Sequence, residues 1–223
     1  MDLIAFVYSL LLIATCMAIS ACVSRIGKSK GKEYSELARK IVHIGVSNWF
    51  FIYYFCFENN LYPLLGLVLF AIVNAFLNVT GLFHKLMGQE SKKRNWGLVY
   101  YPISVALLIA LYQAGLGDKV TIGCALLGMG YGDGGAALIG RKFGKHKIEI
   151  TDKTMEGSAA MAVITFVVVF ALKSLLGCSS STFMLLIGSV GLGLIAAVVE
   201  LFTPYGLDNI TVPILIYLLG SAL

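Results

Sequence analysis

The sequence predicts an all-α, polytopic transmembrane helical bundle with seven to eight spans. Of the 223 residues, 58% are apolar and only 13% are charged, whereas soluble domains carry about 25% charged residues. The apolar residues fall into segments close to the length of about 20 residues that a helix needs to cross a bilayer. No linker rich in Pro, Ser or Gly divides the chain, so we expect residues 1–223 to form a single integral-membrane domain.

Eight apolar segments are the candidates for these helices. They lie near residues 3–23, 41–58, 61–83, 96–114, 119–140, 157–177, 183–202 and 210–222. The first stays apolar for about 20 residues before a basic loop, which favours a spanning helix over a signal peptide. The eighth has only about 13 residues, so we expect it to be tilted, partly re-entrant or a short end of the bundle. The five cysteines lack metal-binding spacing and predict neither a zinc site nor a disulfide framework.

The basic residues predict the orientation of the chain. All but two of the 17 Lys and Arg residues lie in three loops: residues 24–40, 84–95 and 141–156. An alternating topology puts these loops on one side of the membrane, and the positive-inside rule makes that side cytoplasmic. The N-terminus is then outside, and the turn at residues 203–209 returns to the cytoplasmic face.

A polar, basic stretch interrupts the apolar pattern between Gly130 and Ser158. It begins with Asp133, and an acid inside an apolar segment is a functional candidate by default. The cations Arg141, Lys142, Lys145, His146 and Lys147 follow it. Mg²⁺ is commonly held by one or two carboxylates together with substrate phosphates. An acid followed by a cluster of cations therefore predicts that this stretch binds a polyanion that carries a divalent metal.

The glycines around Asp133 allow two interpretations. They could open or unwind the helix so that the acid lines a cavity. Alternatively, they serve close helix packing while a neighbouring lysine neutralises the carboxylate. The sequence leaves both interpretations open.

The spacing of residues 133–157 resembles the nucleotide-binding signature of CTP-dependent lipid-alcohol kinases: Asp133-x-x-Ala136-x-x-x-Gly140-x-x-x-Gly144, then Lys153-Thr154-x-Glu156-Gly157. This family includes phytol kinase, dolichol kinase and the yeast-type CTP-dependent diacylglycerol kinase, and the run GRKFGKHKI is most similar to the phytol kinase branch. The resemblance implies CTP as co-substrate and Mg²⁺ as cofactor. It also implies nucleotide-binding roles for Gly132, Gly134, Gly140, Arg141, Lys142, Gly144, Lys145, Lys147, Lys153, Thr154, Glu156 and Gly157.

The end of this signature leads into the sixth apolar segment. The unsatisfied N–H groups at that helix start favour an anion. We expect Lys153 to contact phosphate, although a lysine here could also simply extend to the membrane interface. Glu156 could cap the helix or complete the metal site.

A second segment similar to the family contains Arg39, Lys40 and His43. Arg39 and His43 lie one helical turn apart on one face. A basic cluster at this place can also mark only the inner membrane surface. The resemblance makes His43 a candidate to contact phosphate or to position the alcohol.

A third segment contains Glu200, Asp208 and Asn209. A glutamate as deep in an apolar segment as Glu200 is expensive unless it is paired or functional. Asp208 or Asn209 could cap the last helix. Alternatively, Asp208 joins Asp133 in binding metal or accepts the proton of the alcohol.

These observations and the resemblance predict a CTP-dependent kinase that phosphorylates a membrane isoprenoid alcohol of the phytol, farnesol or polyprenol/dolichol type at the cytoplasmic face. The expected catalytic residues are Asp133, Lys153, Asp208 and His43, and the expected metal ligands are Asp133, Glu156 and Asp208. The expected partners are CTP, the lipid alcohol and the bilayer, and no nucleic acid. The alternatives are a CTP-dependent diacylglycerol kinase, a phosphatidate cytidylyltransferase that makes CDP-lipid, and a membrane transporter. The transporter is disfavoured because the charge is concentrated on one face.

Overall fold

The computed structural model describes residues 1–29, 35–82, 96–149, 151, 153–177 and 180–223. The described residues form helices and connecting turns, with one isolated β-bridge between Lys147 and Thr154. The helices are α1 (Asp2–Ser29), α2 (Ser35–Ser47), α3 (Trp49–Cys56), α4 (Leu61–Val79), α6 (Gly97–Gln113), α7 (Lys119–Phe143), α8 (Met155–Leu176), α9 (Thr182–Phe202) and α10 (Asp208–Gly220). The predicted all-α class is therefore confirmed.

Among the described residues, five helices are long and apolar enough to cross a membrane, namely α1, α4, α7, α8 and α9. Helices α6 and α10 are also apolar but shorter. The 13 residues of α10 rise only about 20 Å, against a hydrocarbon thickness of about 30 Å. The chain is therefore a multi-pass membrane protein with five candidate spans in the part that the structure describes.

The predicted span at residues 41–58 is not one continuous helix. Helix α2 ends at Ser47 and α3 begins at Trp49, with Asn48 between them. The Asn48 side-chain amide donates to the carbonyl of Ile44 (2.9 Å), and its oxygen accepts from the hydroxyl of Tyr131 in α7 (2.8 Å). An amide that bonds the preceding turn competes with regular helical bonding. The contact with Tyr131 also ties this junction to α7.

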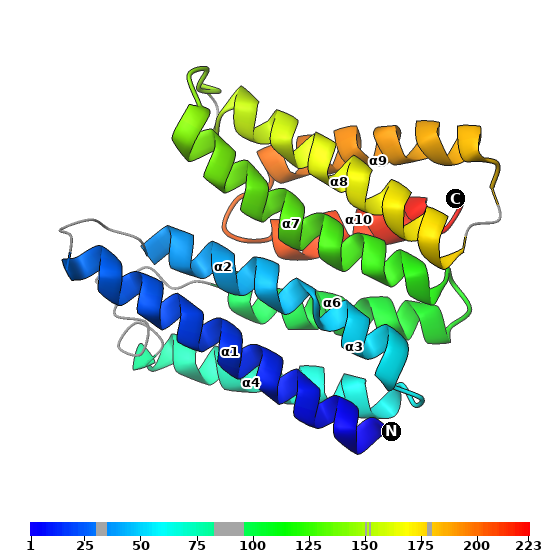
Figure 1. Ribbon diagram of the computed structural model, residues 1–223, viewed down its shortest axis with the longest axis horizontal. Coiled ribbons are helices and arrows are strands. Elements are labelled where there is room, and N and C mark those ends of the chain that lie inside the picture. Colours follow the sequence, from blue (N-terminus) through cyan, green and yellow to red (C-terminus); the bar gives the residue numbers. More distant parts are fainter. Residues whose placement is uncertain (30–34, 83–95, 150, 152, 178–179) are drawn as a thin grey trace.

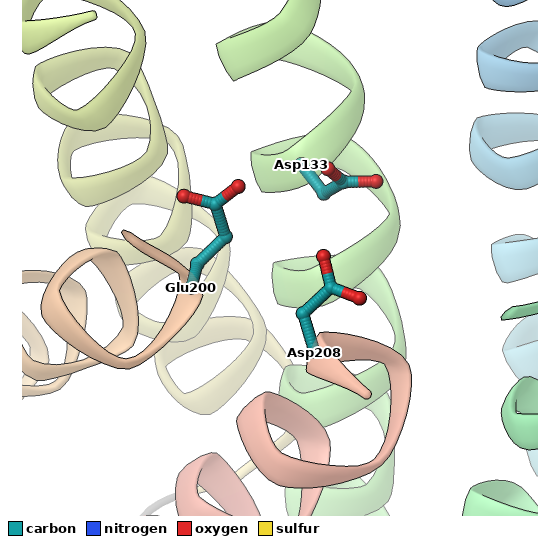
Figure 2. A group of neighbouring side chains, drawn as sticks. All are labelled: Asp133, Glu200 and Asp208. Atoms are coloured by element: carbon teal, nitrogen blue, oxygen red, sulfur yellow. The ribbon is translucent and has the colours of Figure 1, made fainter. Parts of the chain in front are cut away.

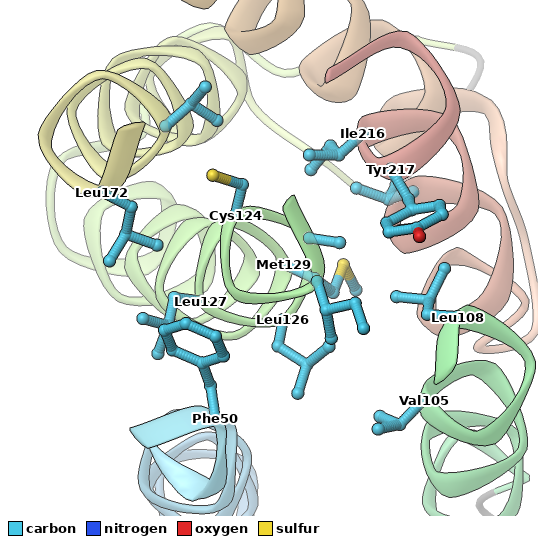
Figure 3. Packing of buried hydrophobic residues seen from close by; sticks show 14 of the residues in the cluster. Phe50, Val105, Leu108, Cys124, Leu126, Leu127, Met129, Leu172, Ile216 and Tyr217 are labelled. Atoms are coloured by element: carbon cyan, nitrogen blue, oxygen red, sulfur yellow. The ribbon is translucent and has the colours of Figure 1, made fainter. Parts of the chain in front are cut away.

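Helix α7 is the centre of the bundle. In its most apolar 18-residue stretch, 72% of the residues are buried, against 22–33% in the other four long helices. Figure 3 shows buried side chains from α3, α6, α8 and α10 around it, including Phe50, Leu108, Leu172 and Ile216. A helix buried on all sides can place a polar group inside the protein, away from lipid.

The glycines of α7 serve close packing, and the helix stays continuous through all of them. A Cβ atom at Gly130 or Gly134 would overlap Ser47 or Ile44 of α2, and one at Gly132 would lie 2.5 Å from the sulfur of Met161 in α8. Of the two interpretations left open by the sequence, the structure agrees with close packing and not with an unwound helix. Small residues instead let α2 and α8 approach α7 closely, and Asp133 lies in the same segment.

The helix ends that carry the predicted motifs gather at one end of the bundle. Figure 1 shows the ends of α1, α4, α7 and α9 and the starts of α2, α6, α8 and α10 on one side, with both chain termini on the other. The described parts of loops 24–40, 141–156 and 203–209 therefore share one end, as expected. Residues 30–34 and the loop 84–95, which contains Lys85, Lys92, Lys93 and Arg94, lie outside the described residues.

Candidate active site

Three carboxylates from three helices meet at this end of the bundle. Asp133 comes from α7, Glu200 from the last turn of α9 and Asp208 from the first turn of α10. One carboxylate oxygen of each lies within 4.8 Å of the other two, as Figure 2 illustrates. Asp133 is 7% exposed and Glu200 is 4% exposed. These residues are called the three-acid cluster below.

A tight turn between α9 and α10 brings two of these acids together. Gly206 adopts a φ of 79°, a left-handed conformation that glycine accepts readily. A Cβ atom there would lie 3.1 Å from the backbone nitrogen of Gly97 at the start of α6. The turn therefore needs glycine for its backbone conformation and for its close approach to α6, and it returns Asp208 to the end of α9.

Helix α2 brings positive charge to Asp133. The Lys40 ammonium donates to both carboxylate oxygens of Asp133, at 2.6 Å each. His43 Nε2 lies 3.7 Å from Asp133 Oδ2 and has no hydrogen-bond partner among the described residues. Arg39, on the same helix, is close enough to act on Asp133 electrostatically. The pairing of Asp133 with a lysine, one of the alternatives left open by the sequence, is therefore present.

Lys153 lies against Glu200. Its ammonium is 2.7 Å from Glu200 Oε1 and also donates to the backbone carbonyl of Glu200. The side chain of Glu200 is 6% exposed and that of Lys153 is 32% exposed. The pair joins residues 47 positions apart in the sequence. The three acids therefore have two lysine ammonium groups beside them.

Asp208 is the member of the three-acid cluster whose carboxylate contacts no lysine among the described residues. The negative charges of Asp133 and Glu200 act unfavourably on the Asp208 carboxylate, and the positive charges of Lys153 and Lys40 act favourably on it. Its Oδ1 accepts from the backbone and side-chain amides of Asn209. The N-cap position of α10 is Leu207, which makes no side-chain capping bond. Asp208 and Asn209 therefore do not cap α10 in the expected way.

The donor set of the three-acid cluster fits a divalent cation. Carboxylate oxygens are the ligands that Mg²⁺ prefers, together with water and substrate phosphates. Three clustered carboxylates repel one another, and a cation between them relieves that repulsion.

Glu156 lies apart from this cluster. It accepts hydrogen bonds from the backbone amides of Lys145 (3.1 Å) and His146 (3.3 Å), and His146 Nδ1 lies 2.7 Å from its carboxylate. Of the three expected metal ligands, Asp133 and Asp208 come together. Glu156 instead holds the loop after α7, and Glu200 takes the third place in the acid cluster.

The glycines and threonine of the signature hold α7 and α8 together. Thr154 is the N-cap of α8, and its hydroxyl accepts from the amide of Gly157. A Cβ atom at Gly140 would lie 2.8 Å from that hydroxyl, and one at Gly144 would overlap the carbonyl of Gly140. The amide of Met155 is bonded to the carbonyl of His146. The amides of Met155 and Gly157, which could otherwise bind an anion at the start of α8, therefore already make hydrogen bonds within the protein.

The remaining cations of the signature lie further out. Arg141 begins about 12 Å beyond Asp133 along α7, given eight residues at a rise of about 1.5 Å each. The exposed cations of this region are Arg141, Lys142, Lys145, His146 and Lys147. They can attract a polyanion from water toward this end of the bundle.

Tyr101 belongs to the surroundings of the site, although no motif marks it. Its ring packs edge-on against His43, with ring centroids 4.9 Å apart. Its hydroxyl is buried and has no hydrogen-bond partner in the part of the chain that the structure describes. An aromatic residue at a helix start is more typical of a membrane-interface position, so the sequence pattern contains no signal for this contact.

Comparison with known proteins agrees with the resemblance in the signature. The chain is 30% identical over 192 residues to the phytol kinase of Synechocystis, an alignment that covers 85% of this chain and 78% of that protein. It is 32% identical over 127 residues to the dolichol kinase of Schizosaccharomyces pombe, which covers 56% of this chain and 24% of that protein. No family model and no solved structure matches the chain. The chain therefore belongs to the family of CTP-dependent lipid-alcohol kinases, in which the phytol kinase branch is nearer to it than the dolichol kinase branch.

Proposed function

We propose that this protein transfers the terminal phosphoryl group of CTP to the hydroxyl of phytol or a similar membrane isoprenoid alcohol, using Mg²⁺ at the three-acid cluster. The similarity to a phytol kinase over most of both chains supports the choice of alcohol. The observation that carries the proposal is the meeting of Asp133, Glu200 and Asp208 with two lysines beside them.

The roles of the residues follow from this geometry. Asp133, Glu200 and Asp208 would hold the metal, which neutralises charge on the phosphates when bound. Lys40 and Lys153 lie within reach of the same space and can contact phosphate oxygens. Phosphoryl transfer depends mainly on positioning and charge neutralisation, and the cluster supplies both.

The reaction needs a group to take the proton of the alcohol. The alcohol oxygen bonds to the γ-phosphorus, the bond from that phosphorus to the β–γ bridging oxygen breaks, and CDP leaves. His43 Nε2 is buried, has no hydrogen-bond partner and lies 3.7 Å from Asp133. A neutral His43 can therefore accept the hydroxyl proton beside the metal ligands.

The orientation is part of the proposal. We take α2 with α3, α6 and α10 as further crossings, which gives eight crossings with the N-terminus outside. The excess of basic residues in loops at the end that holds the acids supports a cytoplasmic site. CTP then arrives from water, and the alcohol arrives from the bilayer.

The test is product analysis with purified protein, γ-labelled CTP and a panel of phytol, farnesol, polyprenol and diacylglycerol. The proposal predicts labelled phytyl phosphate and CDP in equal amounts. If diacylglycerol were the only substrate that became labelled, the protein would be a diacylglycerol kinase and the proposed isoprenoid substrate would be wrong. Release of pyrophosphate with phosphatidate as substrate would identify a cytidylyltransferase and contradict phosphoryl transfer to an alcohol.

A further inference from the structure

An apolar cavity of about 290 Å³ lies between α1, α4 and α6, and no charged residue lines it. Its walls are almost entirely hydrocarbon, and α3 and α7 contribute Trp49 and Leu126 to them. Its volume is near the lower end of the range for small-molecule sites, about 300–1,000 Å³. We call this cavity the lateral groove.

The lateral groove is open on one side and closed on the other. At its edge, Leu10 of α1 is 53% exposed and Leu69 of α4 is 57% exposed. Its inner wall is buried, with Val105 at 2% and Leu126 at 1% exposed. Since α1 and α4 are candidate spans, the open side faces the hydrocarbon of the bilayer. A molecule dissolved in the bilayer can therefore enter from the side.

One residue of the groove wall, Tyr101, contacts the candidate active site. Tyr101 lines the groove and packs edge-on against His43. His43 in turn lies 3.7 Å from Asp133. One pair of rings therefore separates the apolar groove from the three-acid cluster.

Two unpartnered polar atoms mark this junction. The Tyr101 hydroxyl and His43 Nε2 are both buried, and neither makes a hydrogen bond to a residue that the structure describes. An unsatisfied buried polar atom costs about 1–3 kcal/mol, and these two belong to rings that contact each other between the groove and Asp133. A ligand with one hydroxyl group at the end of an apolar chain would supply the missing partner.

We propose that the lateral groove holds the hydrocarbon chain of the alcohol substrate, with its hydroxyl group at Tyr101 and His43. This inference rests on the proposed function and adds the place and direction of substrate entry. A single apolar chain with one small polar end matches a hydrocarbon groove with one polar end. The tail of a longer alcohol would leave through the open side into the bilayer. Tyr101 is then a substrate-contacting residue that positions the reacting oxygen.

The first experiment narrows the groove. Gly66 of α4 lines it, and a Cβ atom there would meet only the ring of Phe6, at an ordinary distance of 3.7 Å. We expect Gly66→Phe to raise the KM for phytol at least tenfold and to leave the KM for CTP unchanged. The matched control is Leu65→Phe. Leu65 comes directly before Gly66 in the sequence, is 59% exposed and is not one of the residues that line the groove. An unchanged KM for phytol in Gly66→Phe would overturn the inference.

The second experiment removes a single hydroxyl group. Tyr101→Phe keeps the ring that packs on His43, and we expect a several-fold higher KM for phytol with an unchanged KM for CTP. The melting temperature should not fall, because this hydroxyl bonds to none of the described residues. A lower melting temperature with unchanged kinetics would mean that the hydroxyl has only a structural role.

The third experiment measures binding without turnover. The protein has two tryptophans, and Trp49 lines the groove, so Trp96→Phe leaves Trp49 as the only fluorescent tryptophan. Phytol brominated at its double bond should quench Trp49 saturably in a bilayer nanodisc. Gly66→Phe should abolish that quenching, and Leu65→Phe should not.

The outcomes separate this inference from the proposed function. Equal quenching by a brominated phospholipid would mean that the groove holds ordinary bilayer lipid, which overturns the inference. Saturable quenching by brominated phytol without phosphoryl transfer would keep the groove and contradict the proposed function. Phosphoryl transfer with no saturable quenching would keep the function and overturn the groove.

Discussion

Replacing Glu200 by glutamine removes one negative charge from the three-acid cluster and keeps the shape of the side chain. Glu200 is 4% exposed and one of its oxygens lies within 4.8 Å of oxygens from Asp133 and Asp208. The change also leaves the Lys153 ammonium, 2.7 Å from Glu200 in the wild type, without its anionic partner. Both effects make the cluster less favourable for a cation, so we expect Glu200→Gln to weaken metal binding.

The size of this effect can be estimated from electrostatics. At an effective dielectric constant of about 20, a carboxylate and a divalent cation about 4 Å apart attract each other by about 8 kcal/mol. The cost of removing both charges from water offsets much of this attraction. If a net attraction of about 3 kcal/mol is left after this cost, losing it makes the binding of the metal about a hundredfold weaker.

The assay has two readouts and one matched control. Electron paramagnetic resonance measures the binding of Mn²⁺ in the presence of CTP, and a Mg²⁺ titration measures the rate of phosphoryl transfer. Glu156→Gln is the control, because it makes the same chemical change in an acid that bonds the amides of Lys145 and His146. A glutamine oxygen can still accept those bonds, so we expect less than a tenfold change in metal affinity.

A larger loss of metal affinity in Glu156→Gln than in Glu200→Gln would contradict this assignment of the metal site. If Glu156→Gln weakened Mn²⁺ binding a hundredfold and Glu200→Gln had little effect, the metal would lie at the loop after α7. The three-acid cluster would then be a structural network of acids and lysines.

Three other predictions concern neighbouring residues and the orientation. Asp208→Asn should abolish turnover with little change in melting temperature, because asparagine retains an oxygen that can accept from the amides of Asn209; near-normal turnover would remove this residue from the site. Lys153→Ala should raise the KM for CTP far more than that for phytol, and it should lower the melting temperature because buried Glu200 loses its partner. In a cysteine-free background, Lys147→Cys should react with a membrane-impermeant thiol reagent only from the cytoplasmic side; labelling from the other side would reverse the orientation.

Much of the fold could be predicted from the sequence, since apolar length and loop charge are one-dimensional signals. The predicted segments correspond to helices because each consists of a nearly continuous apolar run. The break at Asn48 could not be predicted, because it depends on a hydrogen bond from Tyr131, 83 residues away. The packing role of the glycines in α7 depends in the same way on which helices become its neighbours.

The candidate site could be predicted in part. Asp133 and Asp208 stand out as acids in or beside apolar segments, and the structure brings them together. The choice between Glu156 and Glu200 as the third acid depends on which helix ends meet at Asp133, which the sequence pattern does not contain. The pairing of Lys153 with Glu200 is a similar long-range contact.

The most direct test of the central claim is the rate of label transfer from γ-labelled CTP to phytol by the wild type and by Asp133→Asn across a Mg²⁺ titration. Asp133 lies 2.6 Å from Lys40 and within 4.8 Å of both other acids. We expect the wild type to make labelled phytyl phosphate and one CDP per product in a Mg²⁺-dependent reaction. We expect folded Asp133→Asn to make neither at any Mg²⁺ concentration. Wild-type rates in Asp133→Asn would contradict the claim that the three-acid cluster is the phosphoryl-transfer site.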